Sequence, residues 1–323
     1  MSLKAVYTDT DDLDPTPGIE KLRAAGFDVV RLETHNGAEI LEAARDADAL
    51  LLGYAPITAE MLAQMPKLQI VSLLSTGYDN IDVPAATERG ICVANIGATS
   101  AQEVATHAFA LILSMVRGIG TYKAVADRRE WFKTPYPHIP PRLSQKKLGL
   151  VGFGNIGRSL ATYALPIFES ISFYDPAYAI GEVVNGAVST SLDEVLASSD
   201  VLSLHMPLMP ATKHIFNDTT FAKMKRGVYI VNVSRGGLID SAALIRALDS
   251  GIVKEAALDV LESEPPAEGD ALLKHPHVLI TPHVAFLSEY SMSAYIDVQS
   301  ENIVKWFSNQ EVINSVNGMR NKK

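Results

Sequence analysis

The sequence predicts an α/β protein with two domains, each built on a doubly wound parallel sheet. Its length of 323 residues exceeds the roughly 100–200 residues that one domain usually takes. Short apolar runs typical of strands alternate with segments of helical spacing along nearly the whole chain, as βαβ units require. The alternation forms two successive series, one before residue 100 and one after residue 147. We therefore expect two parallel sheets.

The first series contains four predicted strands, at residues 5–7, 49–52, 70–74 and 91–94. Segments of helical spacing lie among them at 18–25 and 38–47. A longer helix is predicted from residue 100 to about residue 117, because apolar residues recur there every three or four positions. Ser100 and Glu103 at its start fit a capping box, in which the two side chains satisfy backbone amides.

The second series contains six predicted strands, at residues 148–151, 171–174, 201–204, 229–233, 256–260 and 278–280. Before it, residues 127–142 carry four prolines and interrupt the helical pattern, which is typical of an arm or a lid. Residues 289–306 predict a second long helix. If the chain crosses between the domains near residues 100 and 287, the two long helices flank the hinge.

The composition argues against several classes of function. Acidic residues outnumber basic ones, 37 to 28, and no run of Lys or Arg occurs, so a nucleic-acid partner is not expected. The single cysteine, Cys92, allows no disulfide within the chain. We expect a cytoplasmic protein, because the N-terminus turns acidic where a signal peptide is apolar. No membrane segment is expected, because the longest apolar stretch, around residues 109–116, is far shorter than the ~20 residues that span a bilayer. His275 and His277 form the only close histidine pair, so no metal site is expected.

A glycine-rich loop predicts a nucleotide site. Gly152, Gly154 and Gly157 follow directly on strand 148–151 and open a helical segment. In such a loop the first glycine makes the turn, the second admits a pyrophosphate, and the third lets helix and strand pack closely. Asp175 follows the next strand, where a carboxylate binds a ribose 2′-hydroxyl and repels a 2′-phosphate. NAD is therefore expected rather than NADP. The alternative to a nucleotide site is a glycine turn with a purely structural role.

Three charged side chains follow later strands of the second series. Arg235 comes after strand 229–233, Glu264 after strand 256–260 and His283 after strand 278–280. Ligands of open parallel sheets bind at the carboxyl ends of the strands. Each residue alone is ordinary, since a strand-end arginine usually makes a surface ion pair and a single histidine is usually structural. Together they supply a carboxylate anchor, an acid/base and a group that tunes the base, as hydride transfer to a 2-keto acid requires.

Several longer motifs resemble those of the D-isomer-specific 2-hydroxyacid dehydrogenases. The matching stretches span essentially the whole chain and lie at residues 75–82, 85–90, 152–157, 232–240, 257–265 and 281–283. The resemblance implies that Arg235, Glu264 and His283 are the catalytic set. It also implies a discontinuous substrate domain, residues 1–99 plus 287–323, and an NAD-binding Rossmann domain, residues 100–286, which close over NAD in a cleft between them.

The chemistry of the three side chains fits the implied reaction, a reversible reduction of a 2-keto acid to the D-2-hydroxy acid. Arg235 can hold a carboxylate by two parallel hydrogen bonds. Protonated His283 can donate to the ketone oxygen, and neutral His283 can accept the proton in the reverse direction. Glu264 beside the other ring nitrogen would favour the protonated imidazole. Formate dehydrogenases of this superfamily carry glutamine there, so Glu264 argues against formate oxidation.

The resemblance implies further contacts and a partner. Ser75, Thr76 and Gly77 would present backbone amides to the substrate carboxylate. A symmetric homodimer would form through residues 100–117 and 127–142. The cofactor would be contacted by Thr99, Gly152, Gly154, Asn155, Ile156, Gly157, Asp175, His205, Val233 and Asp259, although His205 could equally be an ordinary strand-end residue.

Phe286 and the Ser-Glu pair at 288–289 resemble the branch that contains the C-terminal-binding proteins. Phe286 would favour an apolar or aromatic keto acid, unless it is a hinge-core aromatic. Residues 53–57 contain no Lys or Arg, which disfavours a phosphorylated substrate. Thr106 stands where glutamate is common, for no reason that the sequence reveals. The alternatives to a dehydrogenase are an NAD-sensing, corepressor-like binding protein and an enzyme of different chemistry, such as phosphite oxidation.

Overall fold

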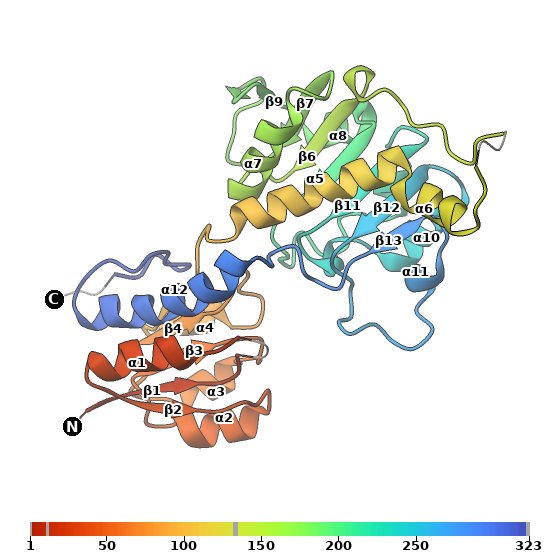
Figure 1. Ribbon diagram of the computed structural model, residues 1–323. Coiled ribbons are helices and arrows are strands. Elements are labelled where there is room, and N and C mark those ends of the chain that lie inside the picture. The colour runs from red at the N-terminus through yellow and green to blue at the C-terminus, as the bar shows by residue number, and fades with distance from the viewer. Residues whose placement is uncertain (1, 11–12, 132–134, 321–323) are drawn as a thin grey trace. The chain divides into compact units, whose positions relative to one another are not determined.

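The computed structural model describes residues 2–10, 13–131 and 135–320, and the chain divides into two compact units. Unit 1 comprises Met1–Thr99 with Leu287–Lys323, and unit 2 comprises Ser100–Phe286. Each unit contains one sheet with helices on its faces (Figure 1). Among the described strands, only β8 and β9 pair antiparallel. The predicted α/β class with two parallel sheets is confirmed.

The sheet of unit 1 has the strand order β2–β1–β3–β4–β5. Its strands are β1 Leu3–Tyr7, β2 Phe27–Arg31, β3 Ala49–Leu52, β4 Ile70–Leu73 and β5 Cys92–Ala94. Its helices are α1 Thr16–Ala24, α2 Gly37–Ala44, α3 Ala59–Ala63, α4 Val83–Glu88 and α12 Glu289–Phe307.

Successive side chains of the unit 1 strands enter two different cores, because neighbouring residues of a strand point to opposite faces. Tyr7 of β1 packs on one face with Leu22 of α1 and Trp306 of α12. Its neighbour Val6 packs on the other face with Ile40 of α2. The apolar side chains of α12 therefore join the C-terminal segment to the N-terminal sheet, and the unit is discontinuous for that reason.

The sheet of unit 2 has the strand order β13–β12–β11–β10–β6–β7–β9–β8. Its strands are β6 Lys147–Val151, β7 Ser170–Tyr174, β8 Val183–Val184, β9 Ala187–Ser189, β10 Val201–Leu204, β11 Val228–Asn232, β12 Val253–Leu258 and β13 Val278–Ile280. Its α-helices are α5 Ala101–Arg117, α6 Ile119–Asp127, α7 Asn155–Ala164, α8 Leu192–Ser198, α9 Asp218–Phe221, α10 Ser241–Asp249 and α11 Ala271–Lys274. Two short 3₁₀ helices, η1 Leu143–Gln145 and η2 Gly236–Leu238, complete it.

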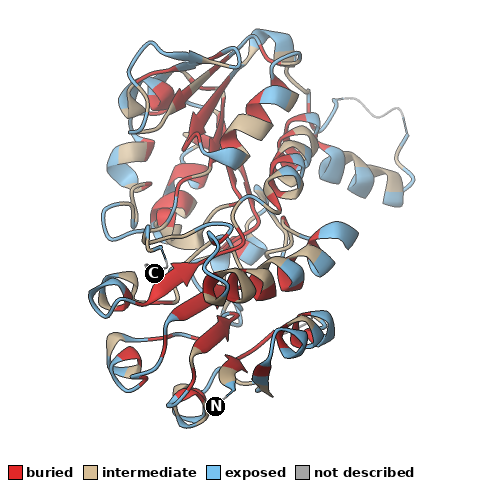
Figure 2. Ribbon diagram, turned by 90° about the vertical axis from the view of Figure 1, so that its left-hand side faces the viewer, coloured by how far each residue is buried: buried red, intermediate tan, exposed pale blue. Residues whose placement is uncertain are grey.

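Helices cover both faces of the unit 2 sheet, and its central strands are buried (Figure 2). Leu150 of β6 packs with Leu111 of α5 on one face. Its neighbour Val151 packs with Leu244 of α10 on the other. Because both faces are covered, the central strands are almost continuously apolar, and this is why the sequence pattern reveals them.

Three strands were not predicted from the sequence, and one predicted helix cap is wrong. Strands β2, β8 and β9 lie at or next to a sheet edge; exposed Asp28 and Arg31 interrupt the apolar pattern of β2, and β8 and β9 are only two and three residues long. The capping box predicted at Ser100 is wrong, because the Ser100 backbone (φ −108°, ψ 21°) is not extended and its hydroxyl does not cap α5. A capping box forms instead at α12, between Ser288 and Ser291.

Helix α6 differs from the other long helices of unit 2. It meets α5 at Gly118, which adopts a left-handed φ of 63°, and none of the described residues of α6 is buried (Figure 2). Across the part of the chain that the structure describes, no single helix is long and apolar enough to span a membrane. The bent pair α5–α6 meets that criterion only by length and composition.

Candidate active site

His283 and Glu264 form a close pair beyond the ends of β13 and β12. Nδ1 of His283 lies 2.6 Å from Oε2 of Glu264, and the Leu261 amide donates to Oε1 of the same carboxylate at 2.8 Å. Burial by itself raises the pKa of Glu264, but the hydrogen bond and charge of His283, the Leu261 amide and Arg235 outweigh burial and lower it. The carboxylate is therefore charged, and it leaves Nε2 of His283 as the ring nitrogen that can meet a ligand.

Arg235 lies directly after β11, at the same edge of the sheet. Its charge contributes to the lowered pKa of Glu264, and the Asn232 side chain donates to the Arg235 carbonyl at 2.9 Å. Gly236 brings this segment against the one that carries Glu264, because a Cβ at Gly236 would stand 1.9 Å from the Leu261 carbonyl carbon. The structure thus brings Arg235, Glu264 and His283 together.

Asp259 holds the turn that carries His283. Its buried carboxylate accepts the Thr281 hydroxyl at 2.5 Å, the Val284 amide at 3.0 Å and the Ala285 amide at 2.9 Å. The His283 amide donates to the Asp259 carbonyl at 2.8 Å, and His283 itself has a left-handed φ of 54°. Such a backbone costs about 1 kcal/mol or more in a residue other than glycine, so the surrounding bonds maintain it.

The glycine loop forms the cradle that a pyrophosphate needs. Gly152 has a φ of 96°, and a Cβ there would stand 2.6 Å from the His205 carbonyl. A Cβ at Gly157 would stand 2.5 Å from the Gly152 carbonyl oxygen, whereas the space around Gly154 is open. Helix α7 begins at Asn155, so the unpaired amides of its first turn lie at this open space. These residues fit a dinucleotide.

Asp175 ends β7 beside the glycine loop. Its carboxylate accepts the Phe153 amide at 2.8 Å and the Ala177 amide at 2.9 Å. Arg158, one turn into α7, donates to the Tyr178 hydroxyl at 3.1 Å. Tyr178, three residues after Asp175, thus contacts a cation from α7.

His205 follows β10, and one of its ring nitrogens is buried without a hydrogen-bond partner among the described residues. Its Nε2 lies 2.9 Å from the Ser203 hydroxyl, while Nδ1 is buried and has no partner among the described residues. Burial lowers the pKa of His205 to about 3, so the ring is neutral near pH 7. An orphaned ring nitrogen beside the glycine loop fits a polar group of a bound ligand.

In unit 1, the predicted substrate loop follows β4. The Ser75 hydroxyl donates to the Gly77 carbonyl at 2.7 Å, and the Thr76 hydroxyl donates to the Gly97 carbonyl at 3.0 Å. Within the described residues no acceptor meets the amides of Thr76 and Gly77. Two adjacent amides of this kind suit an anion, but the role of the loop in substrate binding stays a prediction.

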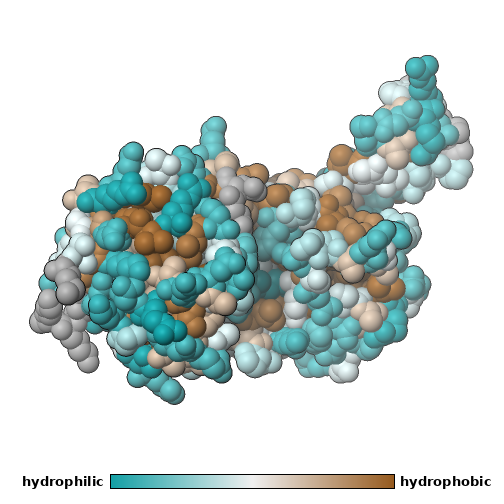
Figure 3. Space-filling model, turned by 90° about the horizontal axis from the view of Figure 1, so that it is seen from below, coloured by the Kyte–Doolittle hydropathy of each residue, from teal (hydrophilic) through white to brown (hydrophobic). Residues whose placement is uncertain are grey.

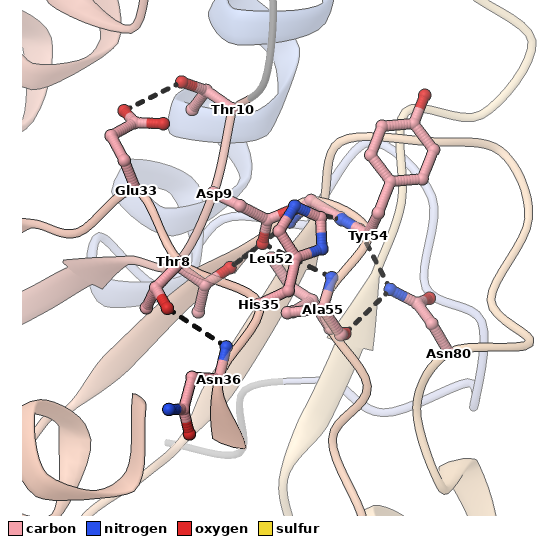
Figure 4. A network of polar contacts seen from close by, with 12 residues as sticks. Thr8, Asp9, Thr10, Glu33, His35, Asn36, Leu52, Tyr54, Ala55 and Asn80 are labelled. Carbon is pink, nitrogen blue, oxygen red and sulfur yellow. Dashed lines mark hydrogen bonds and ion pairs between the residues drawn. The ribbon is translucent and has the colours of Figure 1, made fainter. Parts of the chain in front are cut away.

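A second loop of unit 1, residues 53–55, is held by Asp9, which the sequence analysis did not single out (Figure 4). The buried Asp9 carboxylate accepts the Tyr54 amide at 2.5 Å and the Ala55 amide at 3.4 Å. A Cβ at Gly53 would stand 2.3 Å from that carboxylate. Asn80 closes the loop by donating to the carbonyls of Gly53 and Ala55 at 2.9 and 3.2 Å.

The other predicted contact residues have plain local settings. The Thr99 hydroxyl donates to the Ile96 carbonyl at 2.5 Å, and Val233 is buried at the end of β11. Ile156 is half-buried in the first turn of α7. Phe286 packs partly against the unit 2 core, with its ring centroid 6.5 Å from that of His283. Phe286 is thus a core aromatic that also contacts the candidate acid/base.

The Thr106 hydroxyl is 2.9 Å from both the Gln102 and Glu103 carbonyls of its own helix, which does not explain why threonine stands there in place of glutamate. Its neighbour His107 turns inward and reaches Thr281. No signal in the sequence predicted that contact.

Comparison with known proteins agrees with this geometry. The family model described as "D-isomer specific 2-hydroxyacid dehydrogenase, NAD binding domain" matches residues 109–285, more than half of the chain. The chain is 37% identical over 296 residues to D-3-phosphoglycerate dehydrogenase 2, chloroplastic, of Arabidopsis thaliana, which covers 86% of this chain but only 47% of that protein. It is 34% identical to glyoxylate reductase of Thermofilum pendens, over 90% of this chain and 88% of that one. The chain thus spans about half the length of the first relative and most of the second.

Two solved structures extend the likeness. D-lactate dehydrogenase from Aquifex aeolicus, complexed with NAD and lactic acid, has a TM-score of 0.86 and 29% identity, with 97% of this chain and 99% of that one covered. The NADPH-dependent glyoxylate/hydroxypyruvate reductase from Sinorhizobium meliloti, in complex with NADP and malonate, has a TM-score of 0.88 and 28% identity, with 100% of both chains covered.

Proposed function

The chain belongs to the D-isomer-specific 2-hydroxyacid dehydrogenase family, and on that premise we propose that it interconverts a small, non-phosphorylated 2-keto acid and its D-2-hydroxy acid with NAD(H). The observation that carries the proposal is the 2.6 Å contact between His283 and a charged Glu264, with Arg235 acting on the same carboxylate.

Each side chain has one task in the proposed reaction. NAD(H), when bound, supplies or accepts the hydride. Arg235 binds the substrate carboxylate through its planar guanidinium and orients the adjacent carbonyl. His283 donates a proton from Nε2 to the ketone oxygen during reduction and recovers it during oxidation. Glu264 contacts Nδ1 of His283 and so keeps the orientation of the imidazole, with Nε2 directed to the ketone oxygen.

The first curated relative acts on a phosphorylated compound by its name, but two features of this chain favour a substrate without phosphate. The loop 53–57 has no Lys or Arg, and the buried Asp9 carboxylate lies directly beneath its amides. A dianionic phosphate would meet negative charge there with no cation from the loop to balance it. Phe286 beside His283 favours an apolar substrate tail.

NAD is proposed as the preferred cofactor, because Asp175 would repel a 2′-phosphate. The Arg158 guanidinium donates to the Tyr178 hydroxyl at 3.1 Å and to Oδ1 of Asn155 at 2.6 Å, and neither contact is with Asp175. The Asp175 carboxylate accepts backbone amides only. In these contacts no cation pairs with the Asp175 carboxylate, so its negative charge is left to repel a 2′-phosphate.

The corepressor-like alternative gains no support from the relatives, whose names are those of dehydrogenases and reductases. A place in the branch of the C-terminal-binding proteins rests on Phe286 and the Ser-Glu pair at 288–289 alone.

Oxidation of NADH, followed with a panel of 2-keto acids of increasing chain length and branching, tests the proposed function. We expect turnover with at least one unphosphorylated acid, with loss of that turnover in His283→Asn. Turnover confined to phosphorylated acids would refute the substrate class, and no turnover with any acid would refute the activity. A parallel assay with NAD and phosphite detects the remaining alternative.

We also propose a homodimer formed by α5, α6 and the arm 127–142, of which residues 132–134 lie outside the described part. A hollow of about 310 Å³ lies between α6 and the arm, and Trp131 and Ile139 are 66% and 77% exposed. Figure 3 shows this segment projecting at the upper right, with apolar and polar residues mixed on its surface. A second copy of the chain would cover these apolar side chains.

Sedimentation velocity tests the dimer. Trp131→Asp should convert dimers to monomers, whereas Ile180→Asp, at an exposed position just before the edge strand β8, should not. A wild-type monomer, or a dimer that survives Trp131→Asp, would contradict the proposal.

A further inference from the structure

His107 lies on α5 and connects that helix to the turn that carries His283. Its Nε2 is 3.0 Å from the Thr281 hydroxyl oxygen and 3.5 Å from Oδ1 of Asp259. The His107 side chain is only 25% exposed. These residues are 174 and 152 positions away from His107 in the sequence, respectively, so only the packing of α5 against the sheet brings them into contact.

The direction of these hydrogen bonds follows from the number of protons available. The Thr281 hydroxyl has one proton, and it donates that proton to the Asp259 carboxylate at 2.5 Å. The Thr281 oxygen can therefore only accept from His107, so Nε2 of His107 must carry a proton and act as the donor. The three side chains form a chain of hydrogen bonds that ends on the Asp259 carboxylate.

The Asp259 carboxylate also accepts hydrogen bonds from the amides of Val284 and Ala285, the two residues that follow the strained His283. A donor that fixes Thr281 and Asp259 thus limits the motion of the whole turn. These bonds help to hold the left-handed backbone of His283, so their weakening would let its ring move relative to the Glu264 carboxylate.

We propose that His107 is a positioning residue, which holds the candidate acid/base His283 in place through Thr281 and Asp259. The inference rests on the proposed function, since the task of His283 does. It assigns a role to a residue that contacts neither Arg235 nor Glu264 in the described bonds, and it predicts an effect on the rate of proton transfer rather than on carboxylate binding.

Steady-state kinetics of the full chain with the best keto acid and NADH provide the first test. His107→Leu should lower kcat about tenfold, the effect of one lost hydrogen bond, and change KM for the keto acid less than about twofold, because Arg235 is untouched. His107→Gln keeps an N–H near the place of Nε2 and should restore kcat to within about threefold. Thr106→Ala is the matched control on the same helix and should have no effect, since its hydroxyl binds only its own helix.

Hydrogen exchange provides a readout that needs no activity. The Val284 and Ala285 amides should exchange faster in His107→Leu, at the wild-type rate in Thr106→Ala and at a nearly wild-type rate in His107→Gln. A double-mutant cycle on kcat with Thr281→Val tests whether the two side chains act through one bridge. The two changes should be strongly non-additive, because both remove the same bridge.

The outcomes separate the two proposals. Wild-type protein with no turnover on any keto acid would refute the proposed function, while the exchange rates would still decide whether His107 holds the turn. Unchanged kcat in His107→Leu, with or without faster exchange, would overturn the positioning role, as would additive effects in the cycle or no rescue by glutamine.

Discussion

Replacing Glu264 by glutamine isolates the charge of the His283–Glu264 pair. Glutamine has nearly the same shape, and its amide oxygen can still accept from Nδ1 of His283, while its NH2 group cannot accept the Leu261 amide as Oε1 of Glu264 does. The pKa of Glu264 lies below its ordinary value, because the effects of His283, Leu261 and Arg235 outweigh burial, so the wild-type carboxylate is charged throughout the neutral range. A charged neighbour favours the protonated imidazole that reduction needs. Without that charge the protonated imidazole is less favoured, so we expect reductive activity to be lost earlier as pH rises.

The size of the effect follows from the contact itself. A hydrogen bond to a charged group contributes about 1.5–3 kcal/mol. Both side chains of the 2.6 Å pair are 34% exposed, so solvent screens their interaction and we take the lower end, about 1.5 kcal/mol. Since about 1.36 kcal/mol corresponds to one pH unit, the basic limb of the profile should move down by about one pH unit.

Initial rates of NADH oxidation at saturating keto acid, from about pH 5 to about pH 9, measure this shift. Glu262→Gln is the matched control, because Glu262 contacts His214 at 2.5 Å and is likewise 34% exposed, two residues away from Glu264. Its profile should stay in place. An unmoved profile in Glu264→Gln, or an equal shift in both variants, would refute the reasoning.

Three further predictions address the anchor, the cofactor and the fold. Arg235→Lys keeps the charge but loses the planar guanidinium, so kcat/KM should fall at least ~10²-fold, equivalent to ~2.7 kcal/mol. Arg246→Lys, at an exposed ion pair, should not change kcat/KM, and equal kinetics for both variants would mean that another residue binds the substrate carboxylate. Asp175→Asn keeps an acceptor for the Phe153 amide but removes the charge, so the ratio of kcat/KM for NADPH to that for NADH should rise about tenfold or more; a constant ratio would remove Asp175 from cofactor choice. Gly53→Ala places a methyl group against Asp9 and should lower the free energy of unfolding by about 1–3 kcal/mol in urea titrations. Gly120→Ala on α6 meets open space and should not lower it, and equal stabilities of the two variants would contradict the close approach of Gly53 to Asp9.

Periodicity predicted the buried strands and the long helices, because a strand covered on both faces is apolar along its length and a helix shows its buried stripe every three or four residues. Strand β2 shows the limit. Only Phe27 of its five residues is buried, so pairing with β1, rather than an apolar run, makes it a strand.

The candidate site could be predicted in part because parallel strands end at one edge of a sheet. Arg235, Glu264 and His283 follow successive strands of unit 2, so their order in the sequence already predicts that they lie near one another. The glycine loop could be predicted from its own residues, since one strand–turn–helix segment forms the whole pyrophosphate cradle.

The sequence by itself determined the α/β class, the glycine cradle and the three charged strand-end residues, because each depends on neighbours within one short segment or on the shared direction of the strands. Only the tertiary structure decided that His107 meets Thr281, that Asp9 holds the loop at Gly53, and that Arg158 lies beside Tyr178. Such contacts join side chains from different elements at distances of about 3 Å, and the packing of helices on the sheet sets those distances.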